Sequence, residues 1–403
     1  MSIRNLLGAV AATAMLATSA QAEIANGRVR IGVLTDLSGG YEQNSGNGSV
    51  EAAKMAAEEF GGKINGMPIE ILAGDHQNKP DVGVSVANRW FDVDKVDAVT
   101  DLVNSAVGFA VLDVAKAKNK TVLLTSAGSA DFTGKACAPD NSVHWIYDTY
   151  QMGKGIGLAV PTLGKKWFFI SADYAFGAAL EGAVGAAVKA AGGEVVGSVK
   201  APLGTTDFSS FVLQAQASKA DVIAMNNGGD DAINSVKAAK EFGLMAGGQK
   251  IVALGLDSLP AIKSASLDVA QDGLYVTTWT PDMSADAQAF MKKFIERRKT
   301  APATFHVGTY SAVLNYLKAV QATNSTDPKV VLAQMRKTPV KDAFTQAGTL
   351  REDGRMVHDV YLVRIKKPSE SKSEWDLQEV IATIPGKDAF RPISEGGCPA
   401  FTK

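Results

Sequence analysis

The 403-residue sequence is poor in the residues that metal sites, nucleic-acid surfaces and membrane spans require. Its two cysteines and four histidines show none of the spacings by which these residues bind metals. Its 41 basic and 42 acidic residues are well mixed and give a formal net charge of −1, so it has no basic patch for a nucleic acid. Beyond the N-terminus, no apolar run reaches the roughly 18 residues of a membrane-spanning helix. These absences argue against a metalloprotein, a nucleic-acid binder and an integral membrane protein.

Signatures of catalysis and of cofactor binding are also missing. Gly128 and Gly134-Lys135 come near a phosphate-binding P-loop, but the glycine spacing is one residue too long, and Ala136 stands where a Ser or Thr must bind magnesium. The glycine-rich residues 153–157 follow no predicted strand, and no GxSxG nucleophile motif occurs. The sequence therefore predicts a protein that is not an enzyme and uses no cofactor.

The N-terminus has the pattern of an export signal. Arg4 supplies the positive charge, residues 6–16 form a short apolar core, and Ala20-Gln21-Ala22 fits the small-x-small cleavage rule. The core is too short to span a bilayer. The alternative is a buried N-terminal helix. We expect a signal peptide over residues 1–22, a mature chain that begins at Glu23, and a periplasmic location.

The two cysteines, Cys137 and Cys398, fit such a location. A single pair of cysteines in an oxidising compartment favours a disulfide over two free thiols. The bond would tie the C-terminal tail back to the loop that follows residues 121–131. In the chain-entropy model, a link across so many residues contributes a few kcal/mol of stability.

Two successive stretches of the chain each alternate predicted strands with predicted helices, and 46% of all residues are hydrophobic. The first has strands at 29–34, 68–73, 97–99 and 121–124 and helices at 49–60, 81–92 and 107–117. The second has strands at 167–170, 194–199, 222–225 and 251–254 and helices at 177–191, 208–217 and 232–242. This alternation predicts the α/β class, with two Rossmann-like lobes that each hold a mainly parallel sheet between helices.

Past residue 272 no third unit of comparable size begins. A strand at 273–278 is followed by helices at 285–298, 309–322 and 328–337 and by antiparallel strands at 356–365 and 374–384. We expect 23–144 and 273–355 to form lobe one, 145–272 and 356–390 to form lobe two, and 391–403 to be a tail. Several crossing segments then form a hinge beside a cleft, where the carboxyl ends of the strands meet and ligands bind.

Residues 121–131 (TVLLTSAGSAD) lie at such a strand end. An apolar strand stops at Thr125 and Ser126 and continues into Ala127, Gly128 and Ser129. Free backbone N–H groups and short hydroxyls can converge there on an anion such as a carboxylate. The alternative is an ordinary turn between a strand and a helix.

The order of several motifs resembles the type I periplasmic solute-binding proteins of ABC importers, in their branched-chain amino acid-binding branch. The similar segments are RIGVLTDLSGGY (30–41), INGMPIEI (64–71), SADYAFGAALEGAV (171–184), GTTDFSSFVLQAQASKADVI (204–223) and AAKEFGL (238–244). The resemblance runs from about residue 29 to 365. It implies two lobes joined by three hinge segments that close over a small solute.

The resemblance also places the family's carboxylate-binding loops at Asn104 and Ser105 and at Ala127, Gly128 and Ser129. Hydroxyls and backbone amides of these residues would hold the carboxylate of the ligand.

Two further positions differ from the family pattern. Phe176 stands where the family has a tyrosine, so that hydroxyl is missing, although Tyr174 is two residues away. Asp257 stands near the family's acidic residue for an α-ammonium group, with a side chain shorter than the usual glutamate. The resemblance thus leaves two ligand classes open, aromatic carboxylates and aliphatic amino acids.

Aromatic residues near the predicted hinge and cleft favour the aromatic class, because a flat ring packs well against other rings. The candidates are Trp145, Tyr147, Tyr150, Tyr174, Phe176 and Trp279. We expect a monomer that captures a small carboxylate and passes it to an ABC permease in the inner membrane. The alternatives are a sensor module that signals through a partner and an exported α/β enzyme.

Overall fold

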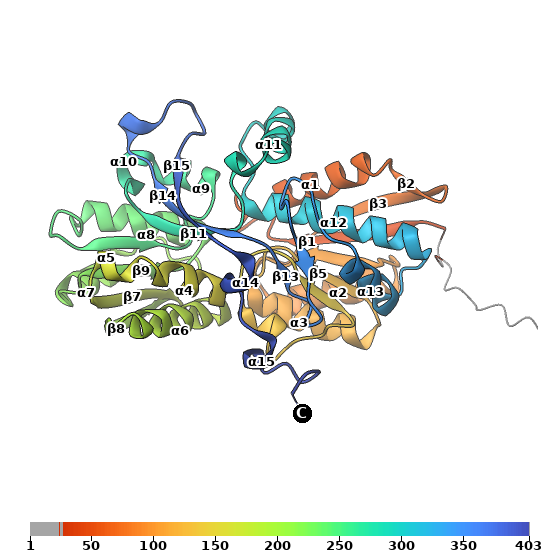
Figure 1. The fold of residues 1–403 in the computed structure, drawn as a ribbon, viewed down its shortest axis with the longest axis horizontal. Helices are drawn as coiled ribbons and strands as arrows, with labels where there is room; N and C mark the ends of the chain where they lie inside the picture. The colour runs from red at the N-terminus through yellow and green to blue at the C-terminus, as the bar shows by residue number, and fades with distance from the viewer. Residues whose placement is uncertain (1–23, 25–26, 403) are drawn as a thin grey trace, which may run out of the picture.

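A computed structural model describes residue 24 and residues 27–402 and shows two α/β lobes side by side (Figure 1). The first lobe contains a six-stranded sheet in the order β2-β3-β1-β4-β5-β6, parallel except for β2. Its strands are β1 (Val29–Thr35), β2 (Lys63–Ile64), β3 (Met67–Asp75), β4 (Ala98–Asp101), β5 (Thr121–Leu124) and β6 (Ser142–His144). The predicted signal peptide, residues 1–22, lies outside the described residues.

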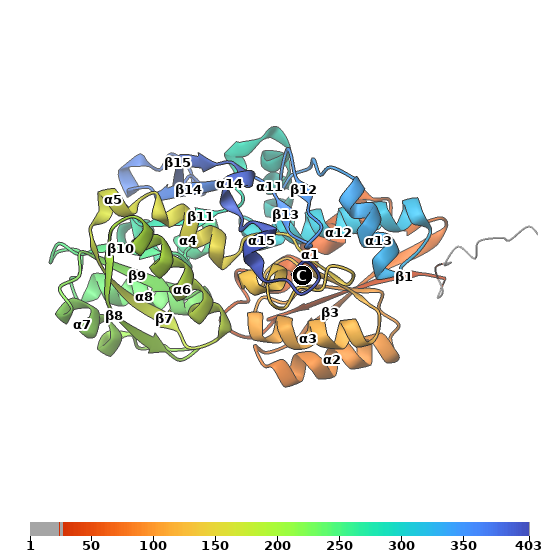
Figure 2. The ribbon, with the colours of Figure 1, turned by 60° about the horizontal axis from the view of Figure 1, so that its bottom comes forward.

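Helices cover both faces of this sheet (Figure 2). They are α1 (Gly46–Glu59), α11 (Ala285–Arg298), α12 (Thr304–Thr323) and α13 (Pro328–Lys337) on one side, and α2 (Pro80–Asp92) and α3 (Ser105–Ala117) on the other. Strand β1 alternates accordingly, since Ile31 and Val33 pack in the core with α1 and α12, whereas Leu34 packs with α2 and α3. A Cβ at Gly32 would overlap the Trp90 ring, which lies directly on the strand.

The second lobe contains a seven-stranded sheet in the order β15-β14-β11-β10-β9-β7-β8. Its strands are β7 (Lys166–Ala172), β8 (Glu194–Ala201), β9 (Val222–Asn226), β10 (Lys250–Ala253), β11 (Leu274–Thr277), β14 (Val360–Ile365) and β15 (Gln378–Ile384). Strand β14 is antiparallel to both of its neighbours, and the other pairs are parallel. The predicted α/β class with two mainly parallel sheets is confirmed.

Helices also cover both faces of the second sheet. They are α4 (Thr149–Gly157), α5 (Val160–Leu163), α6 (Ala175–Ala190), α7 (Ser209–Ala217), α8 (Gly229–Glu241), α9 (Leu259–Ala265) and α10 (Leu267–Ala270). In β7, Trp167 and Phe169 pack with α4 and α6, whereas Phe168 and Ile170 pack with α7 and α8. The four-residue run WFFI thus fills both cores, because every second side chain points to the opposite face.

The predicted boundary at residue 273 is wrong. Strand β11 belongs to the second sheet, where Leu274 pairs with Val252 of β10 and Val276 pairs with Leu362 of β14. The chain returns to the first lobe only after Thr277, through the short η2 (Pro281–Met283). The predicted strand at 356–365 is also divided, into β13 (Met356–Val357), which pairs with β12 (Thr349–Leu350), and β14.

The C-terminal tail contains two short helices, α14 (Gly386–Ala389) and α15 (Ile393–Gly396), and ends against the first lobe (Figure 1). There Cys398 forms a disulfide with Cys137, 261 residues away, with Cα atoms 5.5 Å apart. The predicted disulfide is confirmed. Among the residues that the structure describes, no helix is long and apolar enough to cross a membrane.

Candidate functional site

A cavity between the two lobes lies where the strands of both sheets end. The residues that line it follow β1, β4, β7, β9 and β10 or come from the helices and crossing segments beside them. They are Tyr41, Asn44, Val103, Tyr147, Met152, Tyr174, Phe176, Gly228, Gly229, Leu254, Gly255, Asp257 and Phe305. The free space at its centre is about 20 Å³, roughly that of one water molecule. The lobes are therefore close together around this cavity.

Aromatic rings form much of the wall. The Tyr147 ring meets Phe176 edge-on at 6.3 Å between centroids and Phe305 edge-on at 5.4 Å. The Phe176 ring lies 6.1 Å from Tyr174. Gly128 permits this packing, because a Cβ there would lie 2.6 Å from a ring carbon of Tyr147 and 2.8 Å from one of Phe176. The arrangement suits a flat apolar group.

Two tyrosines join the lobes across the cavity. The hydroxyl of Tyr41, from the first lobe, lies 2.6 Å from the hydroxyl of Tyr174, from the second. Burial raises the pKa of both tyrosines, so both hydroxyls stay protonated. The loop that carries Tyr41 is held by Asp36, whose carboxylate accepts hydrogen bonds from the N–H groups of Gly39 (2.8 Å) and Tyr41 (3.0 Å).

The two predicted anion-binding loops are joined to each other in the first lobe. The side-chain oxygen of Asn104 accepts from the N–H of Ala106 at 2.9 Å and so caps α3. The Ser105 hydroxyl accepts from the N–H of Ser129 at 3.2 Å. The Ser129 hydroxyl in turn accepts from the N–H of Asp131 at 3.4 Å. These bonds fix the shape of both loops.

The chain enters the first of these loops in an unusual conformation. Asp101 and Leu102, at the end of β4, have φ angles of 82° and 60°, in a region that costs such residues roughly 1–3 kcal/mol each. The buried Asp101 carboxyl accepts from the Ser45 hydroxyl at 2.9 Å, and burial raises the pKa of Asp101 to about 6. This strained turn directs Val103 to the cavity.

Two polar side chains of the cavity wall have unused hydrogen-bonding capacity. Burial raises the pKa of Asp257 to about 8, so this carboxyl is mostly protonated at neutral pH. One of its oxygens, and the side-chain oxygen of Asn44, have no hydrogen-bond partner among the described residues. Both residues are less than one-tenth exposed. A ligand group that bonds to them would satisfy buried polar atoms.

The eleven predicted ligand-binding residues fall into three groups. Tyr147, Tyr174, Phe176 and Asp257 line the cavity. Asn104, Ser105, Ala127, Gly128 and Ser129 are buried in the two loops of the first lobe and do not line the cavity, although Gly128 meets the rings of its wall.

The third group, Tyr150 and Trp279, does not reach the cavity. Trp279 is 3% exposed in the core of the first lobe, where its indole N–H donates to the carbonyl of Ala343 at 2.9 Å. Tyr150 lies on α4 beside the C-terminal tail, where burial and the charge of Glu395 raise its pKa. Trp145, also named from the sequence, donates to Ser311 within the first lobe. These three aromatic residues thus pack within the protein and do not line the cavity.

Four cavity residues of the first lobe were not predicted: Tyr41, Asn44, Val103 and Phe305. Tyr41 and Val103 follow β1 and β4, so their strand-end positions could have indicated them. Phe305 comes from the first turn of α12 and has no such signal.

Two α/β lobes around a cavity at the ends of their strands define a two-lobed ligand-binding protein. A family model described as "Periplasmic binding protein" matches residues 28–372. A periplasmic binding protein from Burkholderia mallei is 42% identical and has a TM-score of 0.90, over 93% of this chain and 99% of that one. A branched chain amino acid ABC transporter periplasmic ligand-binding protein from Burkholderia xenovorans LB400 is 41% identical and has a TM-score of 0.81, over 92% and 99%.

The fold is shared more widely. A solute binding protein of an ABC transporter from R. palustris, solved in complex with benzoate, has a TM-score of 0.82 over 92% of this chain and 99% of that one, at 21% identity. The chain belongs to the periplasmic binding protein family, and within it to the type I proteins of the branched-chain amino acid group. The resemblance stated from the sequence is confirmed. The family and these neighbours are solute-binding proteins, and membership implies a periplasmic location.

Proposed function

We propose that this chain is the solute-binding component of an ABC importer and that it captures a small aromatic carboxylate between its lobes. The observation that carries the proposal is the cluster of Tyr147, Tyr174, Phe176 and Phe305 rings around the cavity. The cluster adjoins the loop of Gly128 and Ser129. A benzoate-like acid matches both parts, because it has one flat ring and one carboxylate.

The state of Asp257 favours an aromatic acid over an aliphatic amino acid. With a pKa of about 8, this carboxyl is mostly neutral at pH 7 and is a weak counter-ion for an α-ammonium group. A neutral carboxyl can instead exchange hydrogen bonds with a ring hydroxyl. Phe176, which has no hydroxyl, adds apolar surface at the same wall. The benzoate complex of the R. palustris protein is consistent with this ligand class.

Capture proceeds by hinge closure. Ligand entry requires the lobes to part, because the free space of about 20 Å³ between them holds roughly one water molecule. Closure forms contacts between the lobes, such as the Tyr41–Tyr174 bond and a 2.9 Å bond from the N–H of Asp230 to the carbonyl of Gly40. A ligand that touches both lobes favours the closed state, because only that state makes all of its contacts. The closed monomer then delivers the ligand to the membrane permease.

Titration calorimetry with a matched panel tests the ligand class. The panel contains benzoate, 4-hydroxybenzoate, leucine and benzyl alcohol, which has the ring but no carboxylate. We expect both aromatic acids to bind and the alcohol and leucine to bind far more weakly. Tight binding of leucine with none of the aromatic acids would contradict the proposed ligand class. Uptake of the bound acid in a strain lacking the gene, with and without a plasmid copy, tests the importer role.

A further inference from the structure

The C-terminal tail leaves the second lobe at the hinge. After β15, α14 packs against α4, and Phe390 is buried at 3% exposure. The guanidinium of Arg355 lies 4.5 Å from the centre of the Phe390 ring, and the His358 ring lies 5.1 Å from it. Arg355 also donates to the carbonyl of Ile146, in the segment that crosses between the lobes from β6 to α4. The start of the tail is therefore fixed where the hinge segments meet.

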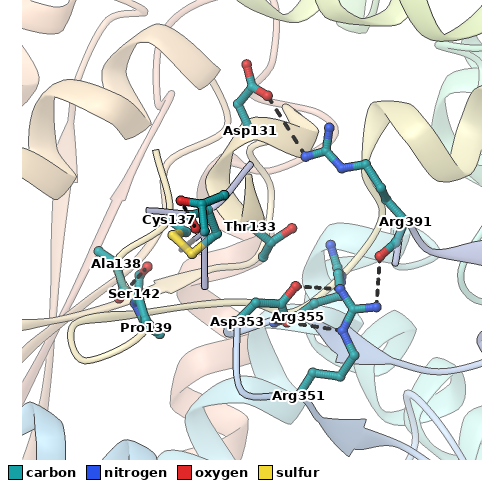
Figure 3. The surroundings of a disulfide bond; sticks show 12 residues. Asp131, Thr133, Cys137, Ala138, Pro139, Ser142, Arg351, Asp353, Arg355 and Arg391 are labelled. Carbon is teal, nitrogen blue, oxygen red and sulfur yellow. Dashed lines mark hydrogen bonds and ion pairs between the residues drawn. A yellow bond between two sulfur atoms is a disulfide. The ribbon is translucent and has the colours of Figure 1, made fainter. Parts of the chain in front are cut away.

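The tail then attaches to the first lobe at several points (Figure 3). The guanidinium of Arg391 donates to the carbonyl of Ala130 at 2.8 Å and lies 3.9 Å from the carboxylate of Asp131. The backbone carbonyl of Arg391 accepts from the Arg351 guanidinium at 2.9 Å. Seven residues later the disulfide of Cys398 closes the attachment. The segment 390–398 thus connects the second lobe, where α14 packs on α4, to the first lobe.

The tail packs closely against the turn η1 (Ala130–Thr133). A Cβ at Gly134 would overlap the Arg391 guanidinium and would lie 2.6 Å from the carbonyl oxygen of Gly396. A Cβ at Gly396 would lie 3.1 Å from the Thr133 carbonyl oxygen. Glycine at 134 is therefore needed for the tail to reach this turn.

This turn follows directly on the loop proposed to hold the carboxylate. The N–H of Ala130 donates to the Thr149 hydroxyl at 3.2 Å, and the N–H of Thr149 donates to the Gly128 carbonyl at 2.8 Å. The carbonyl of Ala130 accepts from Arg391. The first residue after the loop is thus held from two sides, by α4 of the second lobe and by the tail.

We propose that the segment 390–398 is a strap that positions the carboxylate-binding loop, with Arg391 as its positioning residue and the Cys137–Cys398 disulfide as its anchor. The inference rests on the proposed function of that loop. If the strap acts in this way, weakening it lowers ligand affinity by more than it lowers global stability. A tail that only stabilises the fold would lower stability and leave affinity unchanged.

Two variants loosen the strap while the disulfide stays intact. Arg391→Met removes the guanidinium but keeps an apolar side chain, and Gly134→Ala pushes the tail away. Arg297→Met is the control for the first, because Arg297 pairs with Glu51 and Glu58 on the far side of the first lobe. Gly182→Ala is the control for the second, because its Cβ would meet no atom within 4 Å.

Calorimetry with benzoate gives the first readout. We expect roughly fivefold weaker binding in Arg391→Met and Gly134→Ala, the effect of about one weakened hydrogen bond between the loop and the carboxylate, and wild-type binding in both controls. Melting temperature without ligand is measured in parallel. Unchanged affinity in both strap variants, with only a lower melting temperature, would overturn the proposal.

Hydrogen exchange gives a second readout that needs no ligand. In Arg391→Met, the amides of residues 131–136 should exchange faster than in Arg297→Met, while amides of the second sheet are unchanged. If wild-type protein binds no aromatic acid but these amides still exchange faster, the tail orders this turn and the proposed ligand is wrong. If exchange in these residues is unchanged, the strap is wrong whatever the ligand.

Discussion

The two lobes contribute unlike surfaces to the cavity. The first lobe lines it with Tyr41, Asn44, Val103 and Phe305, and behind them lie loops whose polar groups are bonded to one another, from Ser105 through Ser129 to Asp131. The second lobe provides Phe176, the neutral Asp257 and close-packed glycines, of which Gly255 leaves no room for a Cβ beside the Asn227 carbonyl. On the proposed function, the first face holds the carboxylate, whereas the second face encloses the rest of the ligand.

The two faces should therefore contribute to ligand affinity in different ways. A preorganised loop loses little entropy when a carboxylate arrives, so its bonds contribute to affinity directly. Enclosure by the second lobe depends on how closely the backbones of the two lobes approach each other. Substitutions in the second lobe should therefore act through closure, and those in the first lobe through single bonds.

Substitution of Gly229 should give the largest effect on closure of the second lobe. It has a φ of +59°, and a Cβ there would overlap the carbonyl oxygen of Gly40 in the first lobe. We expect Gly229→Ala to weaken benzoate binding by about a hundredfold, because overpacking of this kind costs roughly 1–3 kcal/mol in the closed state. Calorimetry measures the affinity, and small-angle scattering should show a more open molecule.

The control for this variant is Gly243→Ala. Gly243 also has a positive φ, +71°, but a Cβ there meets no atom within 4 Å. This variant should lose stability from backbone strain and keep its affinity. Equal loss of affinity in both variants would mean that strain, and not the contact between the lobes, limits binding.

Substitution of Phe176 tests how much a side chain of the second lobe contributes to enclosing the ligand. Phe176→Ala removes a ring that contacts Tyr147 and Tyr174, and we expect about thirtyfold weaker binding of benzoate from a loss of roughly 2 kcal/mol. Phe211→Ala is the matched control, because Phe211 packs against Phe208 in the other core of the same lobe. Calorimetry with benzoate on both variants shows whether the loss of affinity is specific to the ring in the cavity wall.

Substitution of Ser129 tests the hydrogen bond that the loop of the first lobe is proposed to make to the carboxylate. Ser129→Ala should weaken carboxylate binding about fivefold, the effect of roughly 1 kcal/mol for one hydrogen bond. Ser284→Ala is a suitable control, because Ser284 likewise caps a helix start, accepting from Ala287 at 3.1 Å. Both variants should lose similar stability. Unchanged affinity in Ser129→Ala would remove this loop from the site.

The two faces also differ in how far the sequence predicted them. The loops of the first lobe were predictable, because small hydroxyl-bearing residues follow the apolar strand at residues 121–124 and parallel strands end at one edge. The disulfide was predictable from the presence of a single cysteine pair. Phe305 was not, since it lies in the first turn of α12 and follows no strand of the sheet.

The errors share one physical cause. The run Leu274, Tyr275, Val276 and Thr277 predicts a strand, but a buried strand can pair with either sheet, so its assignment to the first lobe was wrong. In the same way, Trp279 has the size and position of a ligand-binding ring, but its indole N–H is satisfied by Ala343 in the core. Local pattern specifies the type of an element, and tertiary packing selects its partner.

Asp257 should give the smallest effect on binding and a distinct effect of pH. Burial raises the pKa of Asp257 to about 8 in the folded protein, against about 4 in the unfolded chain. Its contribution to stability is then full below pH 4 and is lost as the pH rises towards 8, because only the folded state retains the proton. Asp257→Asn resembles the protonated acid and cannot lose a proton. The variant should therefore match the wild type near pH 4 and exceed its stability increasingly up to pH 8.

Urea unfolding of both proteins between pH 4 and 9, without ligand, measures this difference. Asp230→Asn is a control, because Asp230 is a carboxyl on the same lobe that lies outside the cavity lining and is less buried. Parallel pH profiles for wild type and Asp257→Asn would mean that Asp257 is ionised at neutral pH. The second face would then carry a negative charge suited to an ammonium group, and the amino acid class would replace the aromatic acids as the expected ligand.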